Sequence, residues 1–213
     1  MFARVELRAE DLTTSRRFYA TVLGALPIGP TARDADGRAT AWEDFVLAQA
    51  DDRHVPTRRL HIGFAAPSRA AVDAFWQAGV HAGHHDDGPP GPRPQYLPDY
   101  YGAFLLDPDG NSVEAAHYDG VRDDGAVDHL WIRVGDLAVA RAWYEALAPV
   151  AGWRLRGADE EQVHFGGDGP GGSFALVSDG HPRTERAHLA VVAADRASVG
   201  VRHDPDGNRV ELL

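Results

Sequence analysis

The chain has 213 residues, of which 44% are hydrophobic and 25% charged, as is typical of a globular protein with one large or two small domains. Thirty-two acidic residues against 21 basic ones, all arginine, give a net charge of −11, which argues against nucleic acid or an anionic membrane as partner. The chain has no cysteine, which excludes disulfides and thiolate chemistry, and its charged first residues and lack of a long apolar run predict a cytoplasmic protein.

The first half of the chain alternates between strand and helix patterns. Period-two alternation predicts strands, and apolar spacings of three and four predict helices. Residues 81–99 are dense in Gly and Pro and are expected to form a loop. In chain order, the expected elements are a strand at 2–9, a helix at 15–24, one or two strands at 39–50, a strand at 59–66, a helix at 69–80 and a hairpin of strands at 100–107 and 111–118.

Residues 119–126 are polar and contain Gly, and we expect them to be a domain linker. After them the pattern restarts. Residues 127–152 repeat the strand, Asp-Leu and helix of the first copy, and residues 187–199 repeat 60–72. The glycine-rich segment 166–172 precedes a strand pattern, which favours a hairpin loop over a phosphate cradle.

A phrase of five residues, Asp-Pro-Asp-Gly-Asn, occurs in both copies, at 107–111 and 204–208. It predicts a turn, because proline presets φ, Asp and Asn bond nearby backbone N–H groups, and Gly accepts positive φ. In each case a strand with a carboxylate in apolar company follows, at Glu114 and Glu211. Such a carboxylate either faces solvent or points into a cavity as a ligand.

Counting offsets shows that the second copy is shorter. Equivalent residues are 125 to 127 positions apart in the first parts of the copies but only 97 apart at the final turn. The second copy therefore lacks about 30 residues, which correspond to 73–102 of the first. Each copy consists of two strand–helix–strands units, so that the unit occurs about four times in the chain and the last of these units is shortened.

These features together resemble the vicinal-oxygen-chelate superfamily, which includes glyoxalase I, extradiol dioxygenases and bleomycin-resistance proteins. The resemblance rests on strand–Asp-Leu–helix at 4–19 and 129–144, on the strands that His61 and His188 open, and on the repeated turn followed by Val-Glu. It implies an α+β fold of tandem paired βαβββ modules around a metal. We expect a complete domain at 1–118 and a second, truncated domain at 127–213.

The resemblance also implies the ligands, which come from the first and last strands of the units. In the second copy they are His129, His188 and Glu211, a set of two histidines and one carboxylate that suits Fe, Mn, Ni or Zn and leaves coordination positions open. The alternative is that these histidines are buried strand residues without a metal. The deletion removes a wall of this pocket, and a partner subunit in a homodimer, or the first copy, would have to close it.

In the first copy Arg4 stands at the position of His129, and it would repel a metal and pair with Glu114 instead. We therefore expect a weaker site, or a pocket without metal. Its residues would be His61, Glu114 and Arg4, lined by Trp42, Tyr100 and Tyr101 together with Phe45 and Tyr96. Packing of these aromatic residues in the core is the alternative.

Two functions of different classes follow. The first is a metal-dependent enzyme of the glyoxalase or extradiol-dioxygenase type, which acts on a small molecule with neighbouring oxygens. The second is a metal-free protein that binds and sequesters a small molecule. A scaffold or dimerisation module without ligand is a third. No general base is identified by the sequence.

Overall fold

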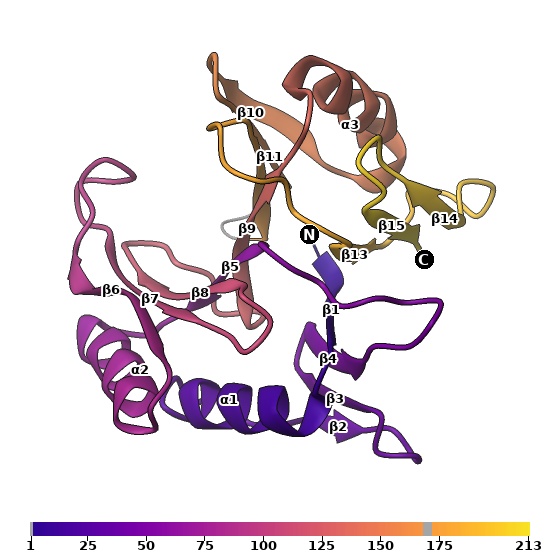
Figure 1. Ribbon diagram of the computed structural model, residues 1–213. Coiled ribbons are helices and arrows are strands. Elements are labelled where there is room, and N and C mark those ends of the chain that lie inside the picture. Colours follow the sequence, from indigo (N-terminus) through magenta and orange to yellow (C-terminus); the bar gives the residue numbers. More distant parts are fainter. Residues whose placement is uncertain (1, 168–171) are drawn as a thin grey trace.

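The computed structural model describes residues 2–167 and 172–213, which form two mixed β-sheets with helices packed on their outer sides (Figure 1). The first copy contains β1 (Phe2–Ala9), α1 (Leu12–Gly24), β2 (Ala32–Arg33), β3 (Ala39–Trp42), β4 (Phe45–Gln49), β5 (His61–Ala65), α2 (Arg69–His81), β6 (His85–Pro92), β7 (Tyr101–Leu106) and β8 (Ser112–His117). The second contains β9 (Val127–Arg133), α3 (Leu137–Ala151), β10 (Arg154–Ala158), β11 (Gln162–Gly166), β12 (Ser173–Val177), β13 (His188–Val191), β14 (Gly200–His203) and β15 (Arg209–Leu212).

The two sheets are each assembled from both copies of the repeat. The seven-stranded sheet has the order β14-β15-β13-β1-β4-β3-β2, and the eight-stranded sheet has the order β10-β11-β12-β9-β5-β8-β7-β6. At the centre of each sheet the first strands of two units pair antiparallel, β1 with β13 and β5 with β9. The α+β fold of βαβββ-type modules expected from the sequence is confirmed.

The two sheets do not correspond to the two copies of the sequence repeat. The expected domains 1–118 and 127–213 each contribute one unit to each sheet, since β1–β4 join β13–β15 and β5–β8 join β9–β12. The reason is physical: every first strand has one edge that its own unit leaves open, and that edge is paired by a unit of the other copy. Residues 119–126 connect β8 to β9 within one sheet, and Arg122 anchors them through Asp44 Oδ2 at 2.9 Å.

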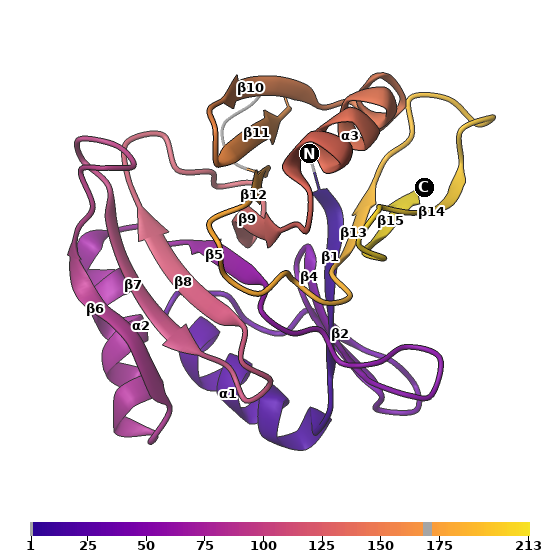
Figure 2. The same cartoon turned by 45° about the horizontal axis from the view of Figure 1, so that its top comes forward.

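The helices begin at the side chains that the sequence offers as caps. Asp11 accepts from the backbone N–H groups of Thr13 and Thr14, and Asp136 accepts from that of Val139. In Figures 1 and 2, α1 and α2 lie together on one side of the molecule and α3 lies on another. Among the described residues, no helix is long and apolar enough to cross a membrane.

The expectation that residues 81–99 are a loop was wrong for β6. This strand runs through Gly88, Pro89, Pro90 and Gly91, but it lies at the edge of its sheet and pairs with β7 alone, in an irregular register. Proline is tolerated there because an edge strand does not need all of its N–H groups for pairing.

The truncation of the last unit is visible as well, since the described residues 192–199 between β13 and β14 contain no helix. The tip of the glycine-rich segment, residues 168–171, lies outside the described residues.

Both Asp-Pro-Asp-Gly-Asn phrases form the predicted turn. Asp107 Oδ1 accepts from the N–H groups of Asp109 and Asn111 at 2.9 and 2.8 Å, and Asp204 repeats these contacts with Asp206 and Asn208 at 3.0 and 2.8 Å. A tyrosine from the helix of another unit completes each turn. Tyr19 donates to Asp107 Oδ2 at 2.9 Å, and Tyr144 donates to Asp204 Oδ2 at 3.1 Å. The turns therefore fasten the helices to the ends of the strands that carry Glu114 and Glu211.

Removing the hydroxyl of Tyr19 should weaken the attachment of α1 to the turn at Asp107. Tyr19→Phe leaves the buried Asp107 with one donor fewer, which should lower the free energy of unfolding by about 1–3 kcal/mol. Urea unfolding followed by circular dichroism measures it. Tyr101→Phe is the control, because its hydroxyl binds Asp73 in a more open place, and it should cost less than about 0.5 kcal/mol. Equal losses in both variants would contradict the role of the turn.

Candidate metal centre

The eight-stranded sheet brings together two histidines and a glutamate from three neighbouring strands. In the register of β5, Gly63 lies opposite Glu114 of β8 on one side and opposite His129 of β9 on the other. His61 is two residues before Gly63 on the same face of β5. His61, Glu114 and His129 are the one group of three or more such side chains, among the described residues, whose ligand atoms converge within 4.8 Å.

The three ligand atoms form a small triangle. His61 Nε2 lies 3.0 Å from Glu114 Oε2, His129 Nε2 lies 3.2 Å from the same oxygen, and the two nitrogens are 3.1 Å apart. A divalent transition metal lies about 2.1 Å from nitrogen and oxygen ligands, so three ligands at right angles are about 3 Å apart. The triangle has the size and the chemistry of one face of an octahedral site.

Further hydrogen bonds orient both imidazoles. Ser112 Oγ donates to Asp87 Oδ2 at 2.7 Å and lies 3.3 Å from His61 Nδ1, so its oxygen is free to accept a hydrogen bond from the N–H of that ring. His129 Nδ1 lies 2.9 Å from Asp128 Oδ2. With both Nδ1 atoms protonated, the neutral rings direct their Nε2 lone pairs at the centre of the triangle.

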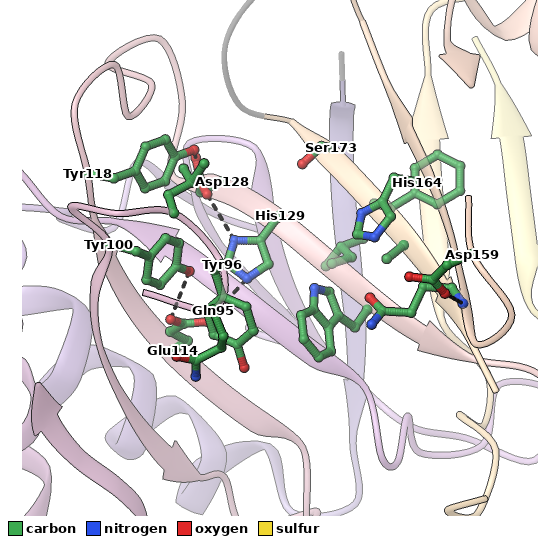
Figure 3. Close-up of a pocket in the computed structure, with 16 residues that line it drawn as sticks. Gln95, Tyr96, Tyr100, Glu114, Tyr118, Asp128, His129, Asp159, His164 and Ser173 are labelled. Carbon is green, nitrogen blue, oxygen red and sulfur yellow. Dashed lines mark hydrogen bonds and ion pairs between the residues drawn. The ribbon is translucent and has the colours of Figure 1, made fainter. Parts of the chain in front are cut away.

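The carboxylates are held by two stacked tyrosines, as Figure 3 shows. Tyr100 donates to Glu114 Oε1 at 2.9 Å and Tyr118 donates to Asp128 Oδ1 at 2.8 Å, with the two rings parallel at 5.4 Å between centroids. The other oxygen of Glu114 is thus left for the two histidines. Burial and the neighbouring carboxylates raise the pKa of both tyrosines, so they remain hydrogen-bond donors at neutral pH.

The electrostatics of the triangle favour a cation at its centre. Burial alone would raise the pKa of Glu114, but its hydrogen bonds to His129 and His61 outweigh this and lower it to about 2. Burial alone would likewise lower the pKa of His129, but Asp128 and Glu114 raise it to about 10. Burial lowers the pKa of His61. The site therefore attracts one positive charge, which is either a proton on His129 or a metal ion.

Two glycines make room for the ligands. A Cβ on Gly63 would lie 2.2–2.7 Å from the ring atoms of His129, and a Cβ on Gly102 would lie 2.4 Å from Glu114 Oε1. Neither distance is compatible with a methyl group unless the ligand moves.

The triangle opens into a cavity of about 540 Å³. Its apolar walls include Tyr96, Leu130, Trp131 and Phe174. Figure 3 shows His164 and Asp159 on the side opposite Glu114 and His129. A volume of this size suits a small organic molecule.

The repeat relates the two halves of this sheet and shows that a fourth ligand is missing. His61 pairs with Ser112 two residues before Glu114, and His129 pairs with Ser173 two residues before Ala175. Ala175 thus occupies the position equivalent to Glu114, and it lines the cavity. A methyl group there cannot coordinate, so the three ligands leave the remaining positions of an ion open to the cavity.

The structure does not bring the expected set His129, His188 and Glu211 together. His129 lies in the eight-stranded sheet, whereas His188 and Glu211 lie in β13 and β15 of the seven-stranded sheet. The cause is the pairing of units across the copies. His61 and Glu114, assigned by the sequence to the weaker site, are the partners of His129.

In the seven-stranded sheet Arg4 completes the equivalent triangle. Ala190 lies opposite Arg4 and Glu211, as Gly63 lies opposite His129 and Glu114. Arg4 Nη2 lies 2.9 Å from Glu211 Oε2, and His188 Nε2 lies 3.1 Å from the same atom. The arginine pairs with a carboxylate as expected, but with Glu211 rather than Glu114. Its guanidinium supplies the cation that a metal or a proton supplies in the other sheet.

The aromatic residues expected in the first pocket go to different places. Tyr100 is in the cavity and holds Glu114. Tyr101 points elsewhere, since its hydroxyl donates to Asp73 at 2.9 Å. Trp42 is fully buried beside Phe45, with the ring centroids 5.8 Å apart, and belongs to the core.

Sequence reasoning missed the residues that orient the ligands, Asp128, Tyr118, Ser112 and Asp87. For Asp128 a local signal exists, because it directly precedes the ligand His129 in β9 and is an acid within an apolar stretch. The others are not marked by any sequence pattern, since their positions depend on the pairing of strands.

Comparison with known proteins identifies the family to which this fold belongs. The model of the Glyoxalase/Bleomycin resistance protein/Dioxygenase superfamily matches residues 2–115. A solved glyoxalase/bleomycin resistance protein from Albidiferax ferrireducens is 33% identical, with 55% of this chain and 99% of that chain covered and a TM-score of 0.50. No curated protein matches.

Two longer structures match nearly the whole chain. Glyoxalase I from Zea mays is 16% identical, with 99% of this chain and 91% of that chain covered and a TM-score of 0.65, and a variant of the maize protein gives 0.69 at the same identity and coverage. At this identity the likeness concerns the fold alone. The chain belongs to the Glyoxalase/Bleomycin resistance protein/Dioxygenase superfamily.

The close approach at Gly63 can be tested through stability. Gly63→Ala should lower the free energy of unfolding by about 1–3 kcal/mol, because the new methyl group displaces the His129 ring. Gly29→Ala is the matched control, since a Cβ there meets nothing within 4 Å, and it should change stability by less than about 0.5 kcal/mol. Urea titration of both variants measures this. A Gly63→Ala protein as stable as the wild type would contradict the described contact.

The seven-stranded sheet predicts a pH-dependent stability through Glu6. Burial alone would raise the pKa of this side chain, but His188, Arg8 and Arg4 outweigh it and lower the pKa from 4.5 to about 2. The ionised Glu6 thus contributes about 3 kcal/mol above pH 4.5, and this contribution is lost as the pH falls toward 2.

Glu6→Gln should therefore be less stable than the wild type by up to about 3 kcal/mol at pH 7, and the difference should fall by more than half at pH 3. Guanidinium unfolding at the two pH values measures this. Glu145→Gln, in an exposed helical pair with Arg141, should cost less than about 0.5 kcal/mol at either pH. A constant difference for Glu6→Gln would contradict the assignment.

Proposed function

We propose that the protein is a metal-dependent enzyme that acts on a small molecule with two neighbouring oxygens. The observation that carries the proposal is the convergence of His61, Glu114 and His129, which present three lone pairs to one point with spacings that fit an ion. Fe, Mn, Ni and Zn all accept this ligand set. A bound divalent ion would act as a Lewis acid on the oxygens of the substrate.

The residues of the cavity support such a role in two ways. Ala175, at the position of a fourth ligand, keeps the side of the triangle that faces the cavity free for substrate. Tyr96, Trp131 and Phe174 offer apolar surface that positions a small organic molecule and displaces water.

A proton acceptor is also within the cavity. His164 and Asp159 line the wall opposite the ligands, and either one is placed to exchange a proton with a substrate that lies between the two walls. Tyr100, Tyr118 and Asp128 act through the ligands and position them.

A metal-free binding protein is the second candidate. It is favoured by the hydrogen bonds that join the three ligands to one another, because a doubly protonated His129 donates to both Glu114 and Asp128 without a metal. In that case the cavity would hold its ligand by the same aromatic walls, and no reaction would follow.

Metal analysis separates the two. Protein purified without a histidine tag and offered each ion should bind about one equivalent, and His129→Ala should weaken binding by more than about a hundredfold, since even the loss of an orienting partner costs 10–100-fold. Inductively coupled plasma mass spectrometry after dialysis measures the content.

His188→Ala is the matched control, because this histidine holds the equivalent position in the other sheet, where it contacts Glu211, the carboxylate that also pairs with Arg4, and the variant should retain the metal. Absence of any bound ion after reconstitution with each metal would refute the enzyme proposal and leave the binding protein. Loss of metal in His188→Ala alone would show that the metal binds in the seven-stranded sheet, which would contradict the proposed site.

A further inference from the structure

The seven-stranded sheet carries a second cavity of different chemistry. It has a volume of about 350 Å³, and four arginines line it, Arg8, Arg53, Arg186 and Arg209. Three histidines also face it, among them His188. Among the described residues of its wall, Asp52 is the one carboxylate. In a chain with a net charge of −11, this is an unusual concentration of positive charge.

The nearby carboxylates compensate only part of this charge. Glu6 Oε1 lies 2.5 Å from Arg8 Nη2, and Glu211 Oε2 lies 2.9 Å from Arg4 Nη2 but 3.6 Å from Arg209 Nη2. Asp51 is engaged by His54 Nδ1 at 3.0 Å. The buried Nε of Arg209 has no hydrogen-bond partner within residues 2–167 and 172–213. The guanidinium groups of two of the arginines, Arg53 and Arg186, form no ion pair with a carboxylate in the part of the chain that the structure describes.

Comparison with the equivalent place in the other sheet sharpens the difference. Arg59 and Arg186 each precede a ligand-position histidine by two residues, and both have positive φ, at 58° and 59°. This backbone conformation therefore belongs to the repeat. Arg59 pairs with the carboxylate of Glu185, whereas the one hydrogen-bond partner of the Arg186 guanidinium among the described residues is the carbonyl oxygen of Gly207, at 3.3 Å from Nη1. Its guanidinium is available to a ligand.

A second difference between equivalent positions of the two sheets adds to the positive charge of this cavity. The residue that pairs with His61 across the strands is Ser112, and the residue that pairs with His188 is Arg209. Where the eight-stranded sheet has a hydroxyl that orients a histidine, the seven-stranded sheet has a further guanidinium. The cavity that adjoins His188 is thus built for the opposite sign of charge from the one that adjoins Glu114.

We propose that this cavity binds a small oxyanion, a molecule with a phosphate group or with two or more carboxylates. Guanidinium groups form paired, charge-assisted hydrogen bonds with both kinds of group, and several of them around one cavity favour a multiply charged ligand. The volume accommodates a ligand of the size of a sugar phosphate or a tricarboxylate. This site is separate from the metal centre, because its residues belong to the other sheet.

Isothermal titration calorimetry of the full chain with sodium phosphate, glucose 6-phosphate and citrate, at ionic strength held constant with sodium chloride, tests the proposal. Saturable binding of at least one of them is expected. Arg53→Gln/Arg186→Gln should weaken it at least tenfold, because these two arginines have no carboxylate to lose and their replacement leaves the fold intact. Binding of the two phosphate compounds would identify the phosphate as the recognised group, and binding of citrate would identify the carboxylates.

Arg33→Gln is the matched control, an exposed arginine of β2 at the far edge of the same sheet, and it should leave the dissociation constant unchanged. The same titration on His129→Ala should also be unchanged, which separates this site from the metal centre. Absence of saturable binding by all three anions would overturn the proposal. An equal loss in Arg33→Gln, or a loss confined to His129→Ala, would overturn it as well.

Discussion

The antiparallel pairing of β5 with β9 is the constraint on which the candidate site depends. These strands are the first strands of two units that lie in different copies of the repeat, and their buried residues Ile62 and Leu130 face each other across the register. The same register sets the imidazole rings of His61 and His129 5.3 Å apart. Glu114 reaches both of them because β8 pairs with the other side of β5. A shift of either strand by one residue would turn a ligand to the opposite face of the sheet.

The same constraint, applied in the seven-stranded sheet, gives a different chemical result. There β1 pairs with β13, and the central carboxylate Glu211 meets one imidazole and one guanidinium. Arginine does not lose its proton in the accessible pH range, so this centre carries a fixed cation, whereas the histidine at the equivalent position, His129, can lose its proton. One substitution at an equivalent position thus separates a centre with a fixed positive charge from one whose charge depends on the protonation of a histidine.

Much of the fold could be predicted from the sequence, because periodicity and capping are local. The Asp-Leu starts of two helices and the two Asp-Pro-Asp-Gly-Asn turns are examples. His61, Glu114 and His129 were also identified, since each stands at a recognisable place in its strand. What could not be predicted is which of them meet. Offsets within a repeat find equivalent residues, whereas spatial neighbours are set by which strand edges pair, and that pairing is not encoded in any short segment. The face of a strand is equally hidden, as the burial of Trp42 in the core shows.

The crossed pairing of units also determines the order in which the sheets can be completed as the chain is made. All strands of the eight-stranded sheet lie between residues 61 and 177, so that this sheet and the triangle of ligands can assemble before residues 178–213 are made. The seven-stranded sheet joins residues 2–49 to residues 188–212. Its first strand must wait, with its edge at Phe2–Glu6 unpaired, until β13 follows more than 180 residues later. Such long-range pairing is slow and leaves an exposed strand edge in the meantime. The seven-stranded sheet is therefore the part of the molecule most exposed to misassembly during synthesis.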